Sequence, residues 1–210
     1  MKTRIVIVRH GHVEGIRPRR FRGREDVPLT PLGRSQAKAT AAVISGTWKP
    51  DCVLVSPMIR CKETGTAIAD ACGLRIEVLQ ALNELDYGAW QWKTHEEIGR
   101  VFPDLYLRWL ATPNLFRFPE GESLQDLTAR TSDAIRHVLR EYRERTVVMV
   151  GHNSVCRALL MQVLDQPLSA YWHLHFDPCG ISEVEFLGDA PRALRINETF
   201  HLSSIQGNWA

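Results

Sequence analysis

The chain has 210 residues, with 26 Lys and Arg against 24 Asp and Glu, a net charge of +2 at pH 7 and 44% hydrophobic residues. This composition is ordinary for a globular protein of one domain, and the nearly balanced charge argues neither for nor against nucleic-acid binding. No stretch approaches the ~20 apolar residues of a membrane span, and the N-terminal apolar run is too short for a signal peptide. The five cysteines are scattered, with no CxxC pair or zinc spacing, which favours a reducing, cytoplasmic location.

Short β-branched apolar runs alternate with longer segments of helical spacing. This pattern predicts an α/β fold with a mostly parallel central sheet and helices on both faces. We expect buried strands at 3–8, 52–55, 76–79 and 146–150, and helices at 31–44, from 57 to about 71, at 123–142 and at 153–164. Two further strands, at about 180–187 and 192–202, should pair antiparallel across the turn at 188–191.

Helix boundaries carry their own signals. Thr30 before Pro31 is a good helix start, with Thr as N-cap and Pro at the first helical position. Ser123 and Asp126 resemble a capping box, with Asp in place of the usual Glu or Gln. Gly46 and Gly73 are expected to end two of the helices.

Two segments break the α/β rhythm. Residues 10–29 form a long loop that carries five of the arginines within eight residues: Arg17, Arg19, Arg20, Arg22 and Arg24. This loop is either a solvated basic segment or a collector of anions. Residues 80–121, rich in Trp and Pro, are expected to form a small cap insertion within a single domain that spans residues 1–210, with short helices near 94–101 and 103–111.

The chemistry concentrates at two strand ends. Arg9, His10 and Gly11 follow the first strand, and Gly151 and His152 follow the strand at 146–150. Ligands of open α/β sheets bind at the carboxyl ends of the strands, so these distant segments should build one site. A neutral imidazole there could accept a phosphoryl group, and arginines would neutralise its equatorial oxygens.

Further side chains complete such a site. Arg60 lies in the first turn of the helix after the strand at 52–55, whose N-terminus adds partial positive charge. Glu84, in the loop after the strand at 76–79, could protonate a leaving alkoxide, and Asp86 is its competitor.

Six ordered elements of the chain resemble the histidine phosphatase superfamily, also called phosphoglycerate mutase-like. The elements are Arg9-His10-Gly11; Asp26 to Thr30 with Gly33; Ser56-Pro57 with Arg60 and Thr64; Glu84 with Tyr87-Gly88; Gly121-Glu122-Ser123; and Gly151-His152. They span nearly the whole chain. One such tripeptide alone would be weak evidence, whereas six in this order are specific.

The resemblance implies a role for each matching residue. His10 would be the nucleophile that forms phosphohistidine, and Arg9, Arg60 and His152 would bind the phosphate. Glu84 would be general acid and then general base, and neither a metal nor a cofactor would be needed. The implied function is hydrolysis of a small phosphorylated metabolite.

The sequence departs from the family at one element. The family continues its first motif with a Thr and an Asn that help to frame the phosphate, but Val13 and Ile16 stand there. Arg19, Arg20 or Arg22 could replace those contacts, and Arg22 is taken as a phosphate-binding candidate. Alternatively, this part of the pocket has fewer contacts.

Three other functions are alternatives to hydrolysis. A phosphoglycerate mutase is disfavoured, because Leu85 and Asp86 stand where the resembled mutases carry a basic segment, and an added carboxylate would repel an acidic substrate. A non-catalytic module that binds phosphorylated ligands would not need the complete set of catalytic residues. Nucleic-acid binding through the Arg-rich loop lacks interleaved aromatic residues and a known motif.

Several residues allow two interpretations. Trp90 and Trp92 either line a substrate cavity or pack the insertion. His173 and His175 are interpreted as structural rather than metal ligands, and His95 and His137 as solvent-facing. His201 could fold over the active-site edge. An exposed Tyr171 or Trp172 could mark the face of a homodimer.

Overall fold

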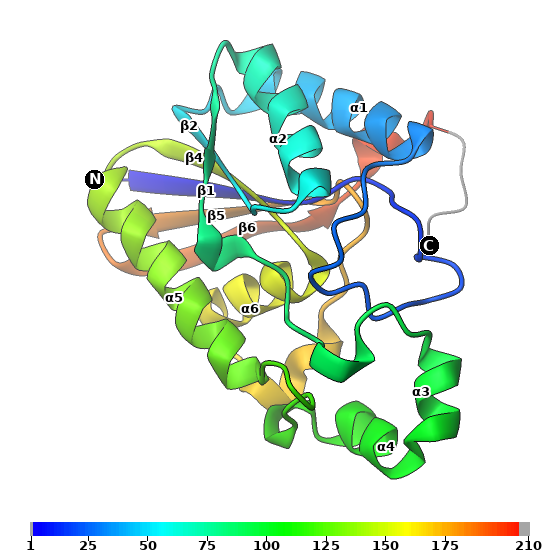
Figure 1. Ribbon diagram of the computed structural model, residues 1–210. Coiled ribbons are helices and arrows are strands. Elements are labelled where there is room, and N and C mark those ends of the chain that lie inside the picture. Colours follow the sequence, from blue (N-terminus) through cyan, green and yellow to red (C-terminus); the bar gives the residue numbers. More distant parts are fainter. Residues whose placement is uncertain (1, 206–210) are drawn as a thin grey trace.

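The central feature of the fold is a six-stranded sheet with the order β3-β2-β4-β1-β5-β6. The computed structural model describes residues 2–205 (Figure 1). The strands are β1 (Lys2–Arg9), β2 (Cys52–Val55), β3 (Ile76–Val78), β4 (Thr146–Gly151), β5 (Ile181–Leu187) and β6 (Ala190–Glu198). Strands β3, β2, β4 and β1 are mutually parallel, and β5 is antiparallel to both of its neighbours. The predicted mostly parallel α/β sheet is confirmed.

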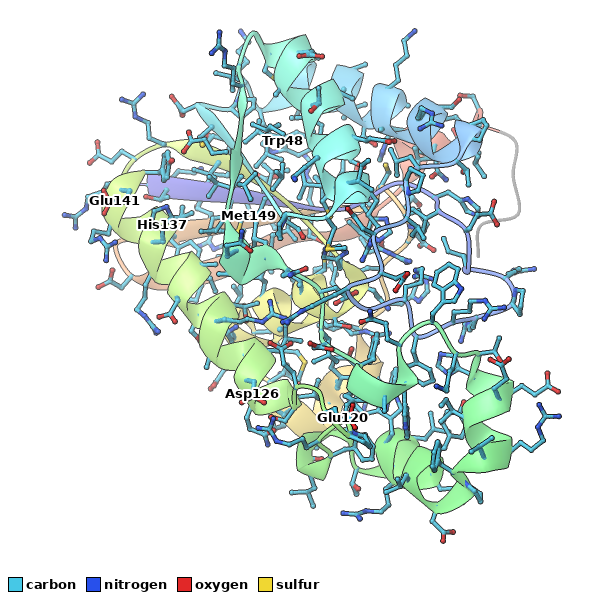
Figure 2. The ribbon with its side chains drawn as sticks, viewed as in Figure 1. Trp48, Glu120, Asp126, His137, Glu141 and Met149 are labelled. Carbon is cyan, nitrogen blue, oxygen red and sulfur yellow. The ribbon has the colours of Figure 1, made fainter. Side chains whose placement is uncertain are left out.

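Helices cover both faces of this sheet, as the sequence predicts. The α-helices are α1 (Pro31–Thr47), α2 (Ile59–Cys72), α3 (His95–Val101), α4 (Pro103–Ala111), α5 (Leu124–Glu141) and α6 (Asn153–Val163). Alternate residues of β1 point to opposite faces: Val6 and Val8 pack with α1 and α2, whereas Ile5 and Ile7 pack with α5 and α6. Figure 2 contrasts the exposed Glu141 at the end of α5 with Met149, which is buried in the sheet.

The caps behave largely as predicted. Thr30 accepts the N–H of Gly33 with Pro31 at the helix start, and Ser123 and Asp126 form a complete capping box. Gly73 ends α2 in the left-handed conformation, with φ of 69°. The expectation for Gly46 is wrong: α1 continues to Thr47, because no left-handed residue is needed where Trp48 closes the last turn with its N–H on Ile44 O.

The C-terminal hairpin differs from the prediction in its second strand. β6 begins at Ala190 and ends at Glu198, so the turn has only the two residues Gly188 and Asp189. Gly188 adopts φ of 62°, which suits a tight hairpin turn. Residues 200–202, expected in the strand, form a short 3-10 helix.

Residues 80–121 contain the helices α3 and α4 and the 3-10 turns at 80–82, 88–90 and 113–115. Their aromatic side chains pack on each other and on the Arg-rich loop: Phe21 contacts Trp90 at 5.2 Å and Phe118 at 6.2 Å between ring centroids. Backbone hydrogen bonds tie the two segments together, from Phe21 N to Lys93 O and from Trp92 N to Phe21 O. The Arg-rich loop is therefore held against this insertion, which lies beside it in Figure 1.

Among residues 2–205 no helix combines the length and apolar character that a bilayer span requires.

Candidate active site

His10 lies directly after β1 and its imidazole is almost completely buried, with 1% exposed. Its Nδ1 lies 2.7 Å from Gly11 O. A carbonyl oxygen can only accept, so Nδ1 carries the proton and Nε2 keeps a free lone pair. Burial, followed by the charges of Arg60, Arg9 and Arg22, holds the pKa of His10 well below its ordinary value. The ring is therefore neutral at pH 7 and able to act as a nucleophile.

His152 follows β4, the parallel neighbour of β1, and its ring meets that of His10 edge-on at 5.2 Å between centroids. Arg60 Nε donates to His152 Nδ1 over 3.2 Å, so the proton of His152 sits on Nε2, 2.7 Å from Ser56 Oγ. Burial and the Arg60 charge lower the pKa of His152 well below its ordinary value. The two strand ends thus form one site, as predicted.

The arginines of the site are held by backbone carbonyls. Arg9 Nη1 donates to Phe176 O, Arg22 Nη1 to Gly15 O, and Arg60 donates to both Gly23 O and Glu25 O. None of these three arginines has a carboxylate within ion-pair distance among the described residues. Burial, together with the charges of Arg9 and Arg60, lowers the pKa of Arg22 to about 9. The site therefore presents several cations that form no ion pair with a described residue, which suits a phosphate.

A cavity of about 490 Å³ opens beside these groups. Arg9, Arg22 and Glu84 line it, whereas His10, Arg60 and His152 lie behind the lining. Glu84 is 7% exposed and its Oε1 accepts the N–H of Leu85 at 2.8 Å. Glu84 therefore shares the cavity with the arginines.

Asp86 does not share this cavity. Its carboxylate accepts the N–H of Gly88 at 2.9 Å and pairs with Arg24 at 3.1 Å. Geometry therefore favours Glu84 over Asp86 as the acid. It also removes the argument that Asp86 would repel an acidic substrate, because this carboxylate is already occupied.

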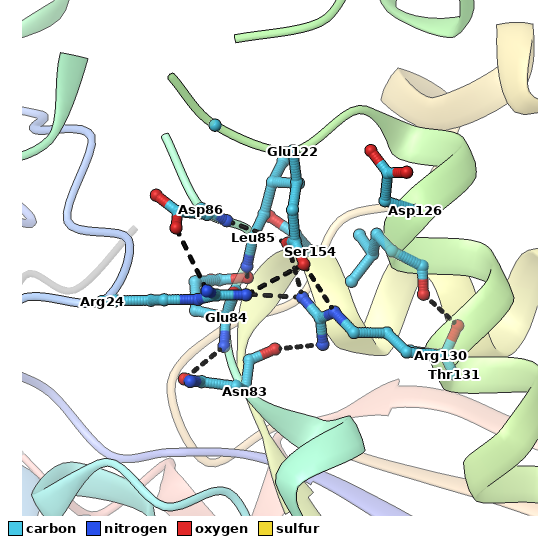
Figure 3. A network of polar contacts seen from close by, with 12 residues as sticks. Arg24, Asn83, Glu84, Leu85, Asp86, Glu122, Asp126, Arg130, Thr131 and Ser154 are labelled. Atoms are coloured by element: carbon cyan, nitrogen blue, oxygen red, sulfur yellow. Dashed lines mark hydrogen bonds and ion pairs between the residues drawn. The ribbon is translucent and has the colours of Figure 1, made fainter. Parts of the chain in front are cut away.

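A partly buried polar network holds the backbone that carries Glu84 (Figure 3). Arg130, from α5, donates to Asn83 O at 2.5 Å and to Glu84 O at 3.1 Å, and pairs with Glu122 at 2.9 Å. Arg24 also donates to Glu84 O, at 3.3 Å, and pairs with the same Glu122 at 2.9 Å. The network fixes the position of the acid-bearing loop from two sides.

Val13 and Ile16, which stand where the resembled family carries Thr and Asn, occupy different places in the structure. Val13 is completely buried in an apolar cluster with Leu29 and Leu202, whereas Ile16 lines the cavity. Of the three candidate replacements, Arg22 is the one whose charge acts on His10. Arg20 donates to Trp92 O, and Arg19 is exposed at the cavity edge.

Some expectations for individual residues are wrong. His95 is not solvent-facing, since it lines the cavity, stacks on Phe21 at 4.2 Å and has its pKa lowered by burial to about 4. His201 does not reach the cavity and hydrogen-bonds Thr40 instead. Tyr171 is buried at 2% exposed. By contrast, the packing alternative that the sequence leaves open for Trp90 is the correct one, since none of its surface is exposed and it does not line the cavity.

The structure adds cavity residues that the sequence reasoning missed. Tyr87, Asn153, Arg157 and Asp177 line the cavity. Asn153 and Arg157 stand one turn apart on α6, the helix that starts directly after His152. Their i and i+4 spacing next to a strand-end histidine was the available signal.

Comparison with known proteins decides the family. Residues 5–199 match the histidine phosphatase superfamily (branch 1). The chain belongs to this superfamily. The resemblance inferred from the six ordered elements is thereby confirmed.

Individual relatives agree with this assignment. The chain is 31% identical over 201 residues to a bifunctional protein of Mycobacterium tuberculosis, covering 95% of this chain and 55% of that protein, so it spans about half the length of this relative. It is 29% identical to phosphoserine phosphatase 1 of Hydrogenobacter thermophilus, covering 97% and 96% of the two chains. A mycobacterial glucosyl-3-phosphoglycerate phosphatase superposes with a TM-score of 0.85 at 26% identity, covering 95% of this chain and 100% of that one.

Proposed function

We propose that the protein is a phosphomonoesterase that hydrolyses a small phosphorylated metabolite through a phosphohistidine on His10. The observation that carries this proposal is the protonation of the His10 ring. Its Nδ1–H is bound to Gly11 O, which leaves Nε2 free beside arginines that pair with no carboxylate in the described part of the chain. A neutral nucleophile surrounded by unneutralised cations suits attack on a phosphate dianion.

In the first step, His10 Nε2 attacks phosphorus and the bond from phosphorus to the ester oxygen breaks. Arg9, Arg22, Arg60 and His152 stabilise the negative charge on the equatorial oxygens. Glu84 gives its proton to the departing oxygen, which leaves as an alcohol. In the second step, water attacks the phosphohistidine, Glu84 takes the water proton, and inorganic phosphate leaves with His10 restored.

This chemistry uses only side chains of the chain and requires no metal. Among residues 2–205 no group of three or more His, Cys, Asp and Glu side chains is arranged around a common point where an ion could bind. The five cysteines are free, which supports the cytoplasmic location inferred from the sequence.

The test is phosphate release from p-nitrophenyl phosphate in EDTA by the wild type and by His10→Ala. His137→Ala is the matched control, because His137 lies on α5 outside the cavity. We expect release by the wild type and the control, no release by His10→Ala, and an acid-labile phosphoryl group on the wild type and the control but not on His10→Ala. Equal release by His10→Ala, or activity that EDTA removes and a divalent cation restores, would overturn the proposal.

The two alternatives give different results. A mutase would interconvert phosphoglycerates in the presence of a bisphosphorylated primer without net release of phosphate. A non-catalytic module would bind phosphate esters and turn over none of them.

A further inference from the structure

Arg157 is a buried cation in the cavity that the proposed chemistry at His10 does not use. Its side chain is held on α6 with 7% of the residue exposed. Its Nε donates to Leu174 O at 2.8 Å. Within residues 2–205 no carboxylate lies within ion-pair distance of its guanidinium. A buried charge without a counter-ion is costly, so its retention at a cavity wall indicates an anionic ligand.

The two carboxylates that line the cavity among the described residues are already bound to other groups. Asp177 Oδ1 pairs with His175 at 3.0 Å, and its Oδ2 accepts from Asn197 at 2.8 Å. Glu84 is bound to the N–H of Leu85. The free guanidinium nitrogens of Arg157 therefore remain for a group that the protein does not supply.

Aromatic rings fix the orientation of this guanidinium. Its carbon lies 4.7 Å from the ring centroid of Tyr171 and 5.0 Å from that of Trp172. Trp172 in turn meets Trp109 at 5.1 Å. Stacking of this kind holds the planar fork of Arg without neutralising its charge, so Arg157 is preorganised to bind a planar anion such as a carboxylate in bidentate fashion.

Two further polar groups at this part of the cavity have no partner. The indole N–H of Trp109 and the side-chain oxygen of Asn153 are buried and make no hydrogen bond within the described residues, although both residues line the cavity. Trp109 is 1% exposed. Buried polar groups are normally satisfied, and a bound molecule would satisfy these two.

The arginines whose charges lower the pKa of His10 are Arg60, Arg9 and Arg22. Arg157 is not one of them and lies instead against the rings of Tyr171 and Trp172. Arg157 is therefore a cavity cation distinct from those that act on the nucleophile.

We propose that Arg157, with Asn153 and Trp109 beside it, is a specificity subsite for a second anionic group on the alcohol part of the substrate. The preferred substrates are then phosphomonoesters whose leaving alcohol carries a carboxylate or another acidic group. This inference rests on the proposed function, because it presumes that the phosphate is bound at His10.

The test compares two esters that differ at one group. Wild type, Arg157→Gln and Arg157→Lys are assayed on 3-phosphoglycerate, which carries a carboxylate, and on glycerol 3-phosphate, which carries a hydroxymethyl group at that position. A charge-assisted hydrogen bond is worth about 1.5–3 kcal/mol. The ratio of kcat/KM for the two esters should therefore fall about 10- to 100-fold in Arg157→Gln.

Arg157→Lys should give an intermediate ratio, because it keeps the charge and loses the planar fork. Arg108→Gln removes an equal charge from the exposed surface of α4 outside the cavity and should keep the wild-type ratio. Thermal unfolding of each variant checks that it is folded. If Arg157→Gln does not fold, Arg157→Lys alone decides by the same ratio.

The outcomes separate this inference from the proposed function. If p-nitrophenyl phosphate is hydrolysed through His10 but the ratio for the two esters is unchanged in both Arg157 variants, the subsite is refuted and the phosphatase stands. If no ester is hydrolysed, titration calorimetry with 3-phosphoglycerate and glycerol 3-phosphate decides. Tighter binding of 3-phosphoglycerate that is lost in Arg157→Gln supports the subsite, and equal binding of both esters overturns it. A bisphosphate ester in the panel distinguishes a second phosphate from a carboxylate as the preferred anion.

Discussion

Arg130→Met is the most informative perturbation of the network behind Glu84. Arg130 donates to the carbonyls of Ala81, Asn83 and Glu84 and pairs with Glu122 through both of its oxygens. Methionine keeps the apolar stem and removes every one of these donors. The variant thus removes a donor from three carbonyls of the acid-bearing loop and from the Glu122 carboxylate, although Glu84 O and Glu122 keep Arg24.

The stability cost can be bounded from the exposure of the pair. Removing one partner of a fully buried ion pair costs about 3–5 kcal/mol. Here both side chains are 18% exposed, and Glu122 keeps Arg24 at 2.9 Å, so we expect a loss of about 2–3 kcal/mol in the free energy of unfolding. With a urea m-value near 2 kcal/mol/M, the midpoint should fall by about 1–1.5 M.

The catalytic effect should depend on the leaving group. Without Arg130 the Glu84 backbone loses a donor that fixes it, so proton donation to the departing oxygen should suffer. Esters of alcohols with high pKa should slow by about 10- to 100-fold. Aryl esters with acidic leaving groups, such as p-nitrophenyl phosphate, should slow much less because they need little protonation.

Arg136→Met is the matched control on the same helix. Arg136 pairs with Asp133 at 2.5 Å, but the two side chains are 65% and 69% exposed, so its removal should change stability by less than about 0.5 kcal/mol. A double-mutant cycle of Arg130→Met with Glu122→Gln should give a coupling of about 1–2 kcal/mol. The reasoning is refuted if Arg130→Met matches the control in urea midpoint and leaves the leaving-group dependence unchanged.

Two further predictions concern the loop after β1 and the loss of stability at acid pH. A Cβ at Gly33 would lie 2.1 Å from His12 O, whereas a Cβ at Gly46 meets nothing within 4 Å. Gly33→Ala should therefore lower the free energy of unfolding by at least about 2 kcal/mol and lower kcat. Gly46→Ala in the same helix should stabilise the protein by about 0.5–1 kcal/mol. Urea midpoints and phosphate release check both, and equal effects of the two substitutions would contradict the close approach. Burial lowers the pKa of His95 to about 4, so the unfolded chain binds more protons than the native protein below about pH 6.5, and stability present above that pH is lost as the pH falls towards 4. After discounting for partial exposure, His95 should account for about 1 kcal/mol of the stability lost between pH 7 and pH 5. His95→Gln should reduce the pH dependence of the unfolding free energy by that amount. If the unfolding free energies of this variant and the wild type change in parallel with pH, the lowered pKa of His95 is wrong.

The sequence predicted best where local rules and the fold agree. The strand ends at His10 and His152 were assigned to one site because parallel strands present their carboxyl ends at a common edge, and the register of β1 on β4 places Arg9 opposite Gly151. The caps of α1 and α5 followed from side chains that satisfy helix N–H groups. These features depend on residues close together in the chain or on the direction of strands.

The sequence predicted least well which side chains face the cavity, because contacts between distant segments decide this. Asp86 and Glu84 are two residues apart in one loop, and only the network through Arg24 and Glu122 turns Asp86 away from the cavity. His95 was placed in solvent because no periodicity marked it as inward-facing, yet stacking on Phe21 from a distant loop buries it. Such contacts join segments far apart in the sequence, and spacing carries no information about them.

Six arginines at or behind the site divide into two classes by the chemistry of their partners. Arg24 and Arg130 pair with Glu122, so their charges are neutralised within the protein and serve the structure. Arg9, Arg22, Arg60 and Arg157 are instead oriented by the carbonyls of Phe176, Gly15, Gly23, Glu25 and Leu174. A carbonyl dipole fixes the direction of a guanidinium but leaves its full charge for a ligand.

Three of these carbonyls, those of Gly15, Gly23 and Glu25, belong to the Arg-rich loop that backbone hydrogen bonds hold against residues 92–95. The loop that the sequence left open as either a solvated segment or an anion collector therefore acts largely through its backbone. Arg22 is its cation that acts on His10, and its carbonyls orient Arg60, which arrives from α2. Its residues Arg17, Arg19 and Arg20 also line the cavity. Residues 80–121 contribute one carboxyl group, Glu84, to the described cavity lining. Because the same residues also hold the Arg-rich loop in place, anion binding at His10 should depend on their packing against this loop.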